Sequence, residues 1–175
     1  MKKLLAASTG LFVLVSLAYG MGSKPSGSTG DKKLDSTLEM INIEAKTDPD
    51  GFIEHLSSRH SIPKQEIQQA KETYGFGAAD IFMATALAKI TNRPVLSIAE
   101  EYKKNQGKGW GVIAKDLGIK PGSREFHQLK GGAQGSLNHM RSMAKSKQQH
   151  EREMKQGQEQ RMKKDSKGKD HGKSR

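Results

Sequence analysis

The stretch AADIFMATALAKI, residues 78–90, decides the fold of this chain. Ten of its thirteen residues are apolar, and they surround the helical axis instead of forming one stripe. A helix that is apolar nearly all round is buried in the core of a protein. We therefore predict that residues 78–90 form the central helix of a small bundle. Asp80 lies in the first turn, where the helix dipole stabilises a carboxylate.

Shorter amphipathic segments flank this central helix. Asp48-Pro49 is a helix-start signal, because a capping carboxylate precedes a proline at the first helical position. Ser61-Ile62-Pro63 opens another helix, and Gly118 is placed to end one in the left-handed conformation with Ile119 packing back. The sequence shows no convincing pair of strands. We predict an all-α domain over residues 34–130, built as a bundle of about five or six short helices.

The positive charge of the chain is concentrated at its C-terminus. Residues 1–20 hold 2 Lys/Arg and no Asp/Glu, residues 21–138 hold 16 against 14, and residues 139–175 hold 12 against 5. These parts carry +2, +2 and +7, which sum to the formal net charge of +11. The body is therefore nearly balanced, and the basic character belongs mainly to the tail.

The C-terminal segment has few side chains that can pack. Gly131, Gly132 and Gly135 predict a hinge, so residues 131–175 are interpreted as a Gly-rich hinge and a basic low-complexity tail. Such a composition cannot bury enough apolar surface to offset the entropy of ordering the chain. We expect a tail that is mobile or partly helical over residues 136–162 and disordered after Lys163.

The first twenty residues have the pattern of an export signal. Lys2 and Lys3 give a positive start, residues 4–19 carry no charge, and Ala18-Tyr19-Gly20 offers small residues beside a cleavage point. We predict cleavage near Gly20, a flexible leader over residues 21–33, and a periplasmic or secreted product. The alternative is an uncleaved anchor helix, although a span needs about 20 predominantly apolar residues. We expect no transmembrane segment in the mature chain.

The segment GWGVIAKDLGI, residues 109–119, carries the sharpest local motif. Its Ile-Ala-x-x-Leu-Gly-Ile core resembles the first helix and turn of a helix-turn-helix unit, in which alanine allows close helix packing and glycine allows a tight turn. The recognition position falls on residues 123–130, with Arg124, His127 and Lys130 as exposed polar groups. Pro121-Gly122 lengthens the turn, and the reading helix is short. The alternative is an ordinary helix–glycine–helix corner.

This segment is also similar to stretches in uncharacterised exported bacterial helical proteins that carry a Gly-Trp-Gly-x-Ile-Ala-Lys-x-Leu-Gly run. The resemblance is local and implies an exported helical protein with no established activity. Trp110, the only tryptophan, is interpreted as a core anchor. Its alternative role is to line a groove, since the glycines on both sides leave its face open.

No constellation of residues supports catalysis or metal binding. His55 and His60 are five apart and point to different faces of a helix, whereas a metal site needs converging ligands, as at i and i+4. The chain has no cysteine, so it can form neither a disulfide nor a thiolate ligand. Glu100-Glu101 are neighbours that point apart on a helix. We predict a non-enzyme without catalytic residue, metal or cofactor.

Three classes of function remain open from the sequence. The leading one is a binding or structural module of the cell envelope, whose cationic tail, including Lys163 and Lys164, contacts polyanions such as anionic lipid head groups, lipopolysaccharide or extracellular nucleic acid. Against it stands a tail that only solubilises the protein. The second class is a nucleic-acid-binding protein that uses the corner at residues 110–130, and the third is an enzyme or enzyme partner with a pocket near Tyr102 and Trp110. Oligomeric state is left open.

Overall fold

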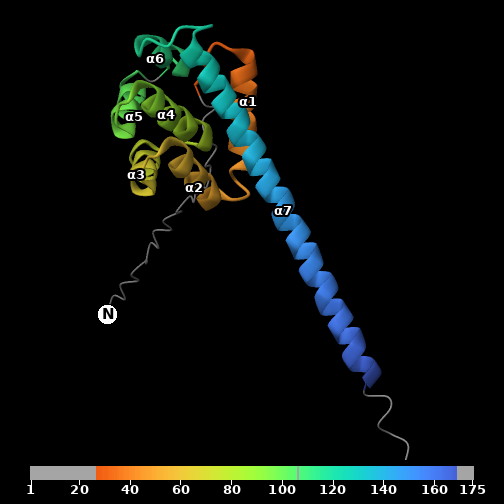
Figure 1. The fold of residues 1–175 in the computed structure, drawn as a ribbon. Helices are drawn as coiled ribbons and strands as arrows, with labels where there is room; N and C mark the ends of the chain where they lie inside the picture. The colour runs from red at the N-terminus through yellow and green to blue at the C-terminus, as the bar shows by residue number, and fades with distance from the viewer. Residues whose placement is uncertain (1–26, 106, 169–175) are drawn as a thin grey trace, which may run out of the picture.

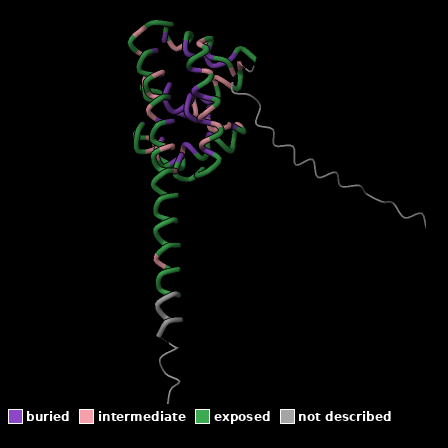
Figure 2. The backbone as a smooth tube through the Cα atoms, turned by 90° about the vertical axis from the view of Figure 1, so that its right-hand side faces the viewer, coloured by how far each residue is buried: buried purple, intermediate pink, exposed green. Residues whose placement is uncertain are grey.

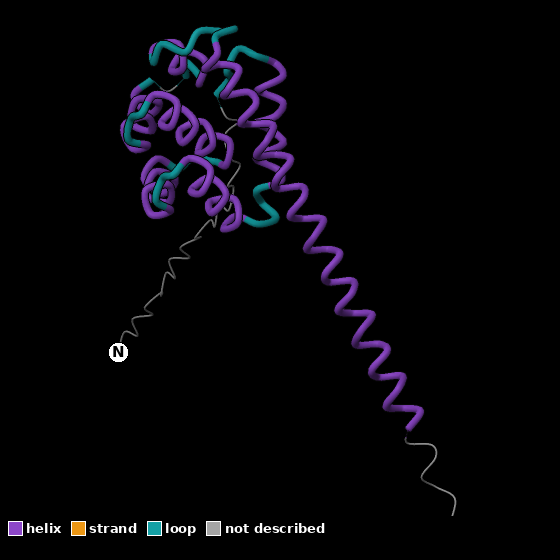
Figure 3. Tube along the Cα trace, viewed as in Figure 1, coloured by secondary structure: helices purple, strands orange, loops and turns teal. Residues whose placement is uncertain are grey.

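A computed structural model describes residues 27–105 and 107–168, with side chains as far as Met162. Within these ranges the chain forms seven helices and no strand (Figures 1 and 3), which confirms the all-α prediction. The helices are α1 (Lys32–Glu44), α2 (Pro49–His60), α3 (Lys64–Tyr74), α4 (Ala78–Thr91), α5 (Val95–Lys104), α6 (Trp110–Asp116) and α7 (Arg124–Gly168). The predicted signal peptide, residues 1–20, lies outside the described residues.

The central helix is α4, as residues 78–90 predict. It packs against α1, α2, α3, α5 and α7, and nine of its fourteen residues are buried. Figure 2 shows the buried positions gathered in the middle of the globular part. Thr85, the buried polar residue of α4, donates its hydroxyl to the carbonyl oxygens of Ile81 and Phe82, so it adds no unsatisfied group.

The start of α2 follows its local signal, but the start of α3 does not. Asp48 caps α2, because its carboxylate accepts a hydrogen bond from the Gly51 N–H at 3.0 Å ahead of Pro49. Ser61 does not start α3; it ends α2 in the left-handed conformation with φ of 58°. The residue that precedes α3 is Pro63, whose side chain has no capping bond to offer.

The predicted hinge at residues 131–135 is wrong, because α7 passes through these glycines without a break. A Cβ added at Gly132 or Gly135 would lie in ordinary contact with the guanidinium group of Arg59 on α2, at 3.4–3.8 Å, and one at Gly131 would meet nothing within 4 Å. Residues 132 and 135 of the continuous helix therefore face α2. The tail takes the helical alternative as far as Gly168, since the same helix runs on beyond the globular part (Figure 1).

We call residues 27–141 the head and residues 142–168 the arm. The arm leaves the head as a single helix and is exposed along almost its whole described length (Figure 2). Twenty-seven residues at about 1.5 Å per residue give a rod of roughly 40 Å. Among the described residues, none of the helices has both the length and the apolar composition needed to cross a bilayer.

The end of the predicted leader is packed rather than flexible. Residues 27–31, which we call the strap, lie against α5 and α6 before α1 begins at Lys32. The Gly27 N–H donates to the Tyr102 hydroxyl at 3.2 Å, and the Gly111 N–H donates to the Ser28 carbonyl oxygen at 3.1 Å. Composition alone predicted a free linker, because it does not show that the backbone of the strap bonds to Tyr102 and Gly111 or that Thr29 bonds to Asp35.

Candidate functional site

Trp110 lies in the core of the head, as the interpretation of a core anchor expected. Its side chain is fully buried and stacks on Tyr102, with ring centroids 3.9 Å apart and an interplanar angle of 8°. Phe76 meets the indole edge-on at 6.0 Å, and the indole Nε1 donates to Asp80 at 2.8 Å. Burial, together with the charge of Asp80, raises the pKa of Tyr102. Asp80 satisfies the polar atom of the indole, and Tyr102 covers a face of the ring. The buried indole therefore offers no surface to a ligand.

The glycines beside Trp110 receive the strap. A side chain at Gly109 would collide with the backbone of Ser28, and one at Gly111 would collide with the carbonyl of Thr29. Gly109 also has a φ of 78°, which L side chains rarely adopt. The Gly-Trp-Gly run therefore allows two backbones to touch over the aromatic cluster, and this accounts for the motif without a phosphate or a nucleic acid.

The corner after α6 has the predicted glycine geometry. Gly118 has a φ of 85°, and the Ile119 N–H donates to the Ala114 carbonyl oxygen at 2.8 Å while the Ile119 side chain is buried. These features form a helix C-cap in which the apolar residue packs back. The predicted short reading helix at 123–130 is instead the first part of the 45-residue α7.

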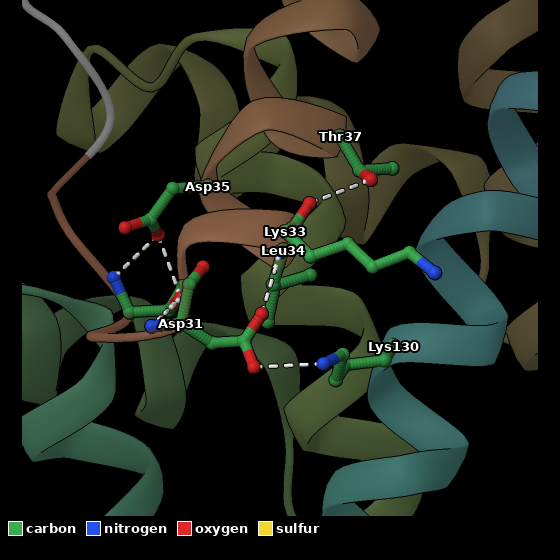
Figure 4. A network of polar contacts seen from close by, with 7 residues as sticks. Asp31, Lys33, Leu34, Asp35, Thr37 and Lys130 are labelled. Atoms are coloured by element: carbon green, nitrogen blue, oxygen red, sulfur yellow. Dashed lines mark hydrogen bonds and ion pairs between the residues drawn. The ribbon is translucent and has the colours of Figure 1, made fainter.

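Three predicted contact residues lie on that first part of α7. Arg124 and His127 are exposed. Lys130 is already engaged: its ammonium contacts Asp31 at 2.7 Å and lies 5.6 Å from the centre of the Phe126 ring. Figure 4 shows Asp31 between Lys130 and the N–H of Leu34. By accepting that N–H, Asp31 caps the start of α1. The hydrogen bond from Lys130 lowers the pKa of Asp31.

The arm places basic groups along one side. Arg141, Lys145 and Arg152 are spaced by four and seven residues, so they lie on the same helix face. Arg141 bonds Glu44 of α1 at 2.9 Å, at the point where the arm leaves the head. Lys145 and Arg152 are exposed and have no ion-pair partner among the described residues. Lys163 and Lys164 belong to α7, but their side chains are outside the description.

A groove that sequence reasoning missed lies in the angle between the head and the arm. Its volume is about 440 Å³, and α2 with the preceding loop forms one wall while α7 forms the other. Phe52, Met140, Met143 and Ala144 are its apolar residues. Acidic residues also line it: Glu44, Asp48, Glu54 and Glu151. In the sequence, only the pair Met140 and Met143 pointed to an apolar surface here. The sequence does not show that α2 packs beside that pair and closes the groove.

Two imidazoles form part of the groove wall. His55 of α2 and His139 of α7 stack with ring centroids 4.2 Å apart, and the His55 Nε2 lies 3.0 Å from the Ser136 hydroxyl. Burial, followed by the neighbouring His139 and Arg59, lowers the pKa of His55 to about 4. Both rings can therefore pack face to face at neutral pH without charge repulsion from His55.

The described residues hold no group of three or more His, Asp or Glu side chains placed to bind one metal ion. The stacked histidines are accompanied by a serine hydroxyl and by Arg59, not by a third ligand. Comparison with known proteins found no matching family model, no matching curated protein and no matching solved structure.

Proposed function

We propose that this chain is an exported, non-enzymatic binding module in which the head holds out a cationic helical arm to polyanions of the cell envelope. The observation that carries the proposal is the arm itself. It holds 8 Lys/Arg against 4 Asp/Glu, a net charge of +4, on a helix that projects from the head (Figure 1). Binding would act by charge neutralisation and counterion release, which weakens with salt.

The arm differs from an ordinary solubilising tail in how its charges are arranged. Because Lys145 and Arg152 share one helix face, they present two cations side by side to a flat or linear anion. Lys155 lies at the edge of the same side. Each basic residue near an anionic membrane contributes about 1 kcal/mol. Three such residues therefore supply about 3 kcal/mol without any base or head-group specificity.

The test neutralises the basic face and leaves the rest of the chain intact. The triple variant Lys145→Gln/Arg152→Gln/Lys155→Gln is compared with Lys32→Gln/Lys71→Gln/Lys115→Gln, which removes three exposed lysines from the head. We expect the arm variant to bind anionic vesicles on the order of 100-fold more weakly and the head variant to bind almost normally. Equal losses in both variants would reduce the effect to net charge and remove the arm from the proposal.

Duplex DNA in the same assay tests the alternative, a nucleic-acid-binding corner at residues 110–130. That alternative predicts that Arg124→Ala weakens binding to DNA and that one sequence is preferred. The engagement of Lys130 with Asp31 reduces the cations available to that corner. Export is tested separately by cell fractionation followed by N-terminal sequencing. A mature protein that starts near residue 21 outside the inner membrane supports it, whereas an intact chain in the cytosol overturns it.

A further inference from the structure

One face of α7 is covered by the head and then continues along the arm without a cover. Its buried residues in the head are Phe126, Leu129, Ala133 and Leu137. The same face goes on through Met140, Ala144, Lys147, Glu151, Met154 and Gln158. The alternating spacing of four and three residues keeps these positions on one seam, as in a coiled coil. Met154 remains 55% exposed, so an apolar residue of the seam faces water in a single chain.

We propose that the arms of two copies pair antiparallel along this seam, so that each arm enters the groove of the other copy. The seam lies on a different side of the helix from Lys145 and Arg152, so pairing leaves the basic face outward. The proposal does not depend on polyanion binding, because Lys145 and Arg152 lie off the seam.

The charges of the seam determine the direction and the register of the pair. In an antiparallel pair, Lys147 can lie opposite Glu151 of the second copy, and two-fold symmetry repeats that contact with the roles exchanged. The same register sets Ala144 opposite Met154 of the second copy and Met140 opposite Gln158. In a parallel pair in register, Lys147 would instead face Lys147 of the second copy, and Glu151 would face Glu151. Both contacts are repulsive.

The groove provides a second element of complementarity. In this register, residues 147–159 of the second arm lie opposite residues 139–151, the part of α7 that lines the groove. Met154 of the second arm then lies at Ala144, beside the apolar Phe52, Met140 and Met143 of the groove. A methionine-lined groove suits a helix that presents an apolar residue on its seam. The arm of a second copy is such a helix.

The first test is sedimentation equilibrium of the purified chain over a dilution series, at low salt. We expect a monomer–dimer equilibrium that Lys147→Glu or Glu151→Lys weakens by about tenfold or more, because each change creates two like-charge contacts. The double variant Lys147→Glu/Glu151→Lys should restore the dimer, since the opposite charges are only exchanged. Lys145→Glu and Glu153→Lys make the same charge changes off the seam and should leave the equilibrium almost unchanged.

A cross-linking test fixes the direction. The chain has no cysteine, so introduced thiols have no native competitor. Residues 144 and 154 are about 15 Å apart along one helix, beyond the reach of a disulfide within a chain. The double variant Ala144→Cys/Met154→Cys should give a disulfide-linked dimer on mild oxidation, and either single variant should not.

Two outcomes would overturn the pairing. A chain that stays monomeric throughout the dilution series refutes self-pairing. Cross-linking by either single variant, as strong as in the double variant, means that the arms run parallel and in register. Circular dichroism of every variant checks that the arm keeps its helix, so that loss of pairing is not confused with unfolding.

Discussion

The indole Nε1 of Trp110 donates a hydrogen bond to Oδ1 of Asp80 at 2.8 Å, which joins the start of α6 to the first turn of the central helix α4. Asp80 also accepts from the Gly77 N–H at 3.3 Å, so one carboxylate satisfies a helix end and a buried ring. Trp110 has no exposed surface, and an indole N–H without an acceptor there would be costly. This contact is what holds the aromatic cluster in register with the bundle.

Replacing Asp80 therefore should destabilise the head. We expect Asp80→Ala to lower the free energy of unfolding by about 1–3 kcal/mol, because a buried donor is left unsatisfied. Asp80→Asn keeps an acceptor and should lose less. Urea titration followed by the fluorescence of Trp110, the only tryptophan, measures both. Glu39→Ala, an exposed acid on α1, is the control, and a loss there as large as for Asp80→Ala would contradict the assignment.

Gly111 and Gly131 should respond in opposite directions to alanine. Gly111→Ala places a methyl group against the Thr29 carbonyl and should detach the strap, seen as faster hydrogen exchange at Gly27 and a loss of stability. A new side chain at Gly131 meets nothing within 4 Å in mid-helix, so Gly131→Ala should add about 0.5–1 kcal/mol. If Gly131→Ala destabilised the protein, residue 131 would be a hinge after all.

Asp31 joins a helix cap and an ion pair, and two variants separate these roles. Asp31→Asn keeps the acceptor for the Leu34 N–H at 2.8 Å but loses the charge opposite Lys130. Asp31→Ala loses both interactions and should lower the free energy of unfolding by about 1–2 kcal/mol. Thermal unfolding of the two variants, each repeated in a Lys130→Met background, gives the coupling between the residues. A coupling near zero would show that the ion pair is screened by solvent.

The free energy of unfolding should fall as the pH is lowered from about 6.5 to 4, because two histidines of the folded chain resist protonation. Burial, with Arg59 next, lowers the pKa of His60 to about 4, and the pKa of His55 is lowered to about 4 as well. The unfolded chain takes up these protons near pH 6.5, but the folded chain does so only near pH 4. The contribution of the neutral rings is therefore complete above about pH 6.5 and is lost as pH falls toward 4.

His60 is the sharper probe of this effect because its Nε2 is buried without a hydrogen-bond partner among the described residues. We expect His60→Leu to reduce the fall in unfolding free energy between pH 6.5 and 4 by up to a few kcal/mol. His127→Gln, an exposed histidine on α7, should not change that slope. Chemical denaturation at a series of pH values is the measurement, and equal slopes for His60→Leu and the parent chain would refute the assignment.

The amino-acid sequence by itself determined the fold class and most helix boundaries. Residues 78–90 are apolar on every side, so no arrangement other than a buried helix satisfies them. Asp48-Pro49 and Gly118 act through bonds to near neighbours, and both were predictable because the cap and its partner are a few residues apart. The burial of Trp110, interpreted as a core anchor, belongs to the same class of inference.

Only the tertiary structure decided what the glycines and the long-range polar groups do. Gly132 and Gly135 look like a hinge until Arg59 is placed against them, and Gly111 looks like loop flexibility until the strap lies on it. Lys130 looks like a free cation until Asp31, 99 residues away, is brought to it. Helical periodicity reports which residues share a face, but it does not report which distant element covers that face. For that reason the groove between α2 and α7 could not be predicted from the sequence.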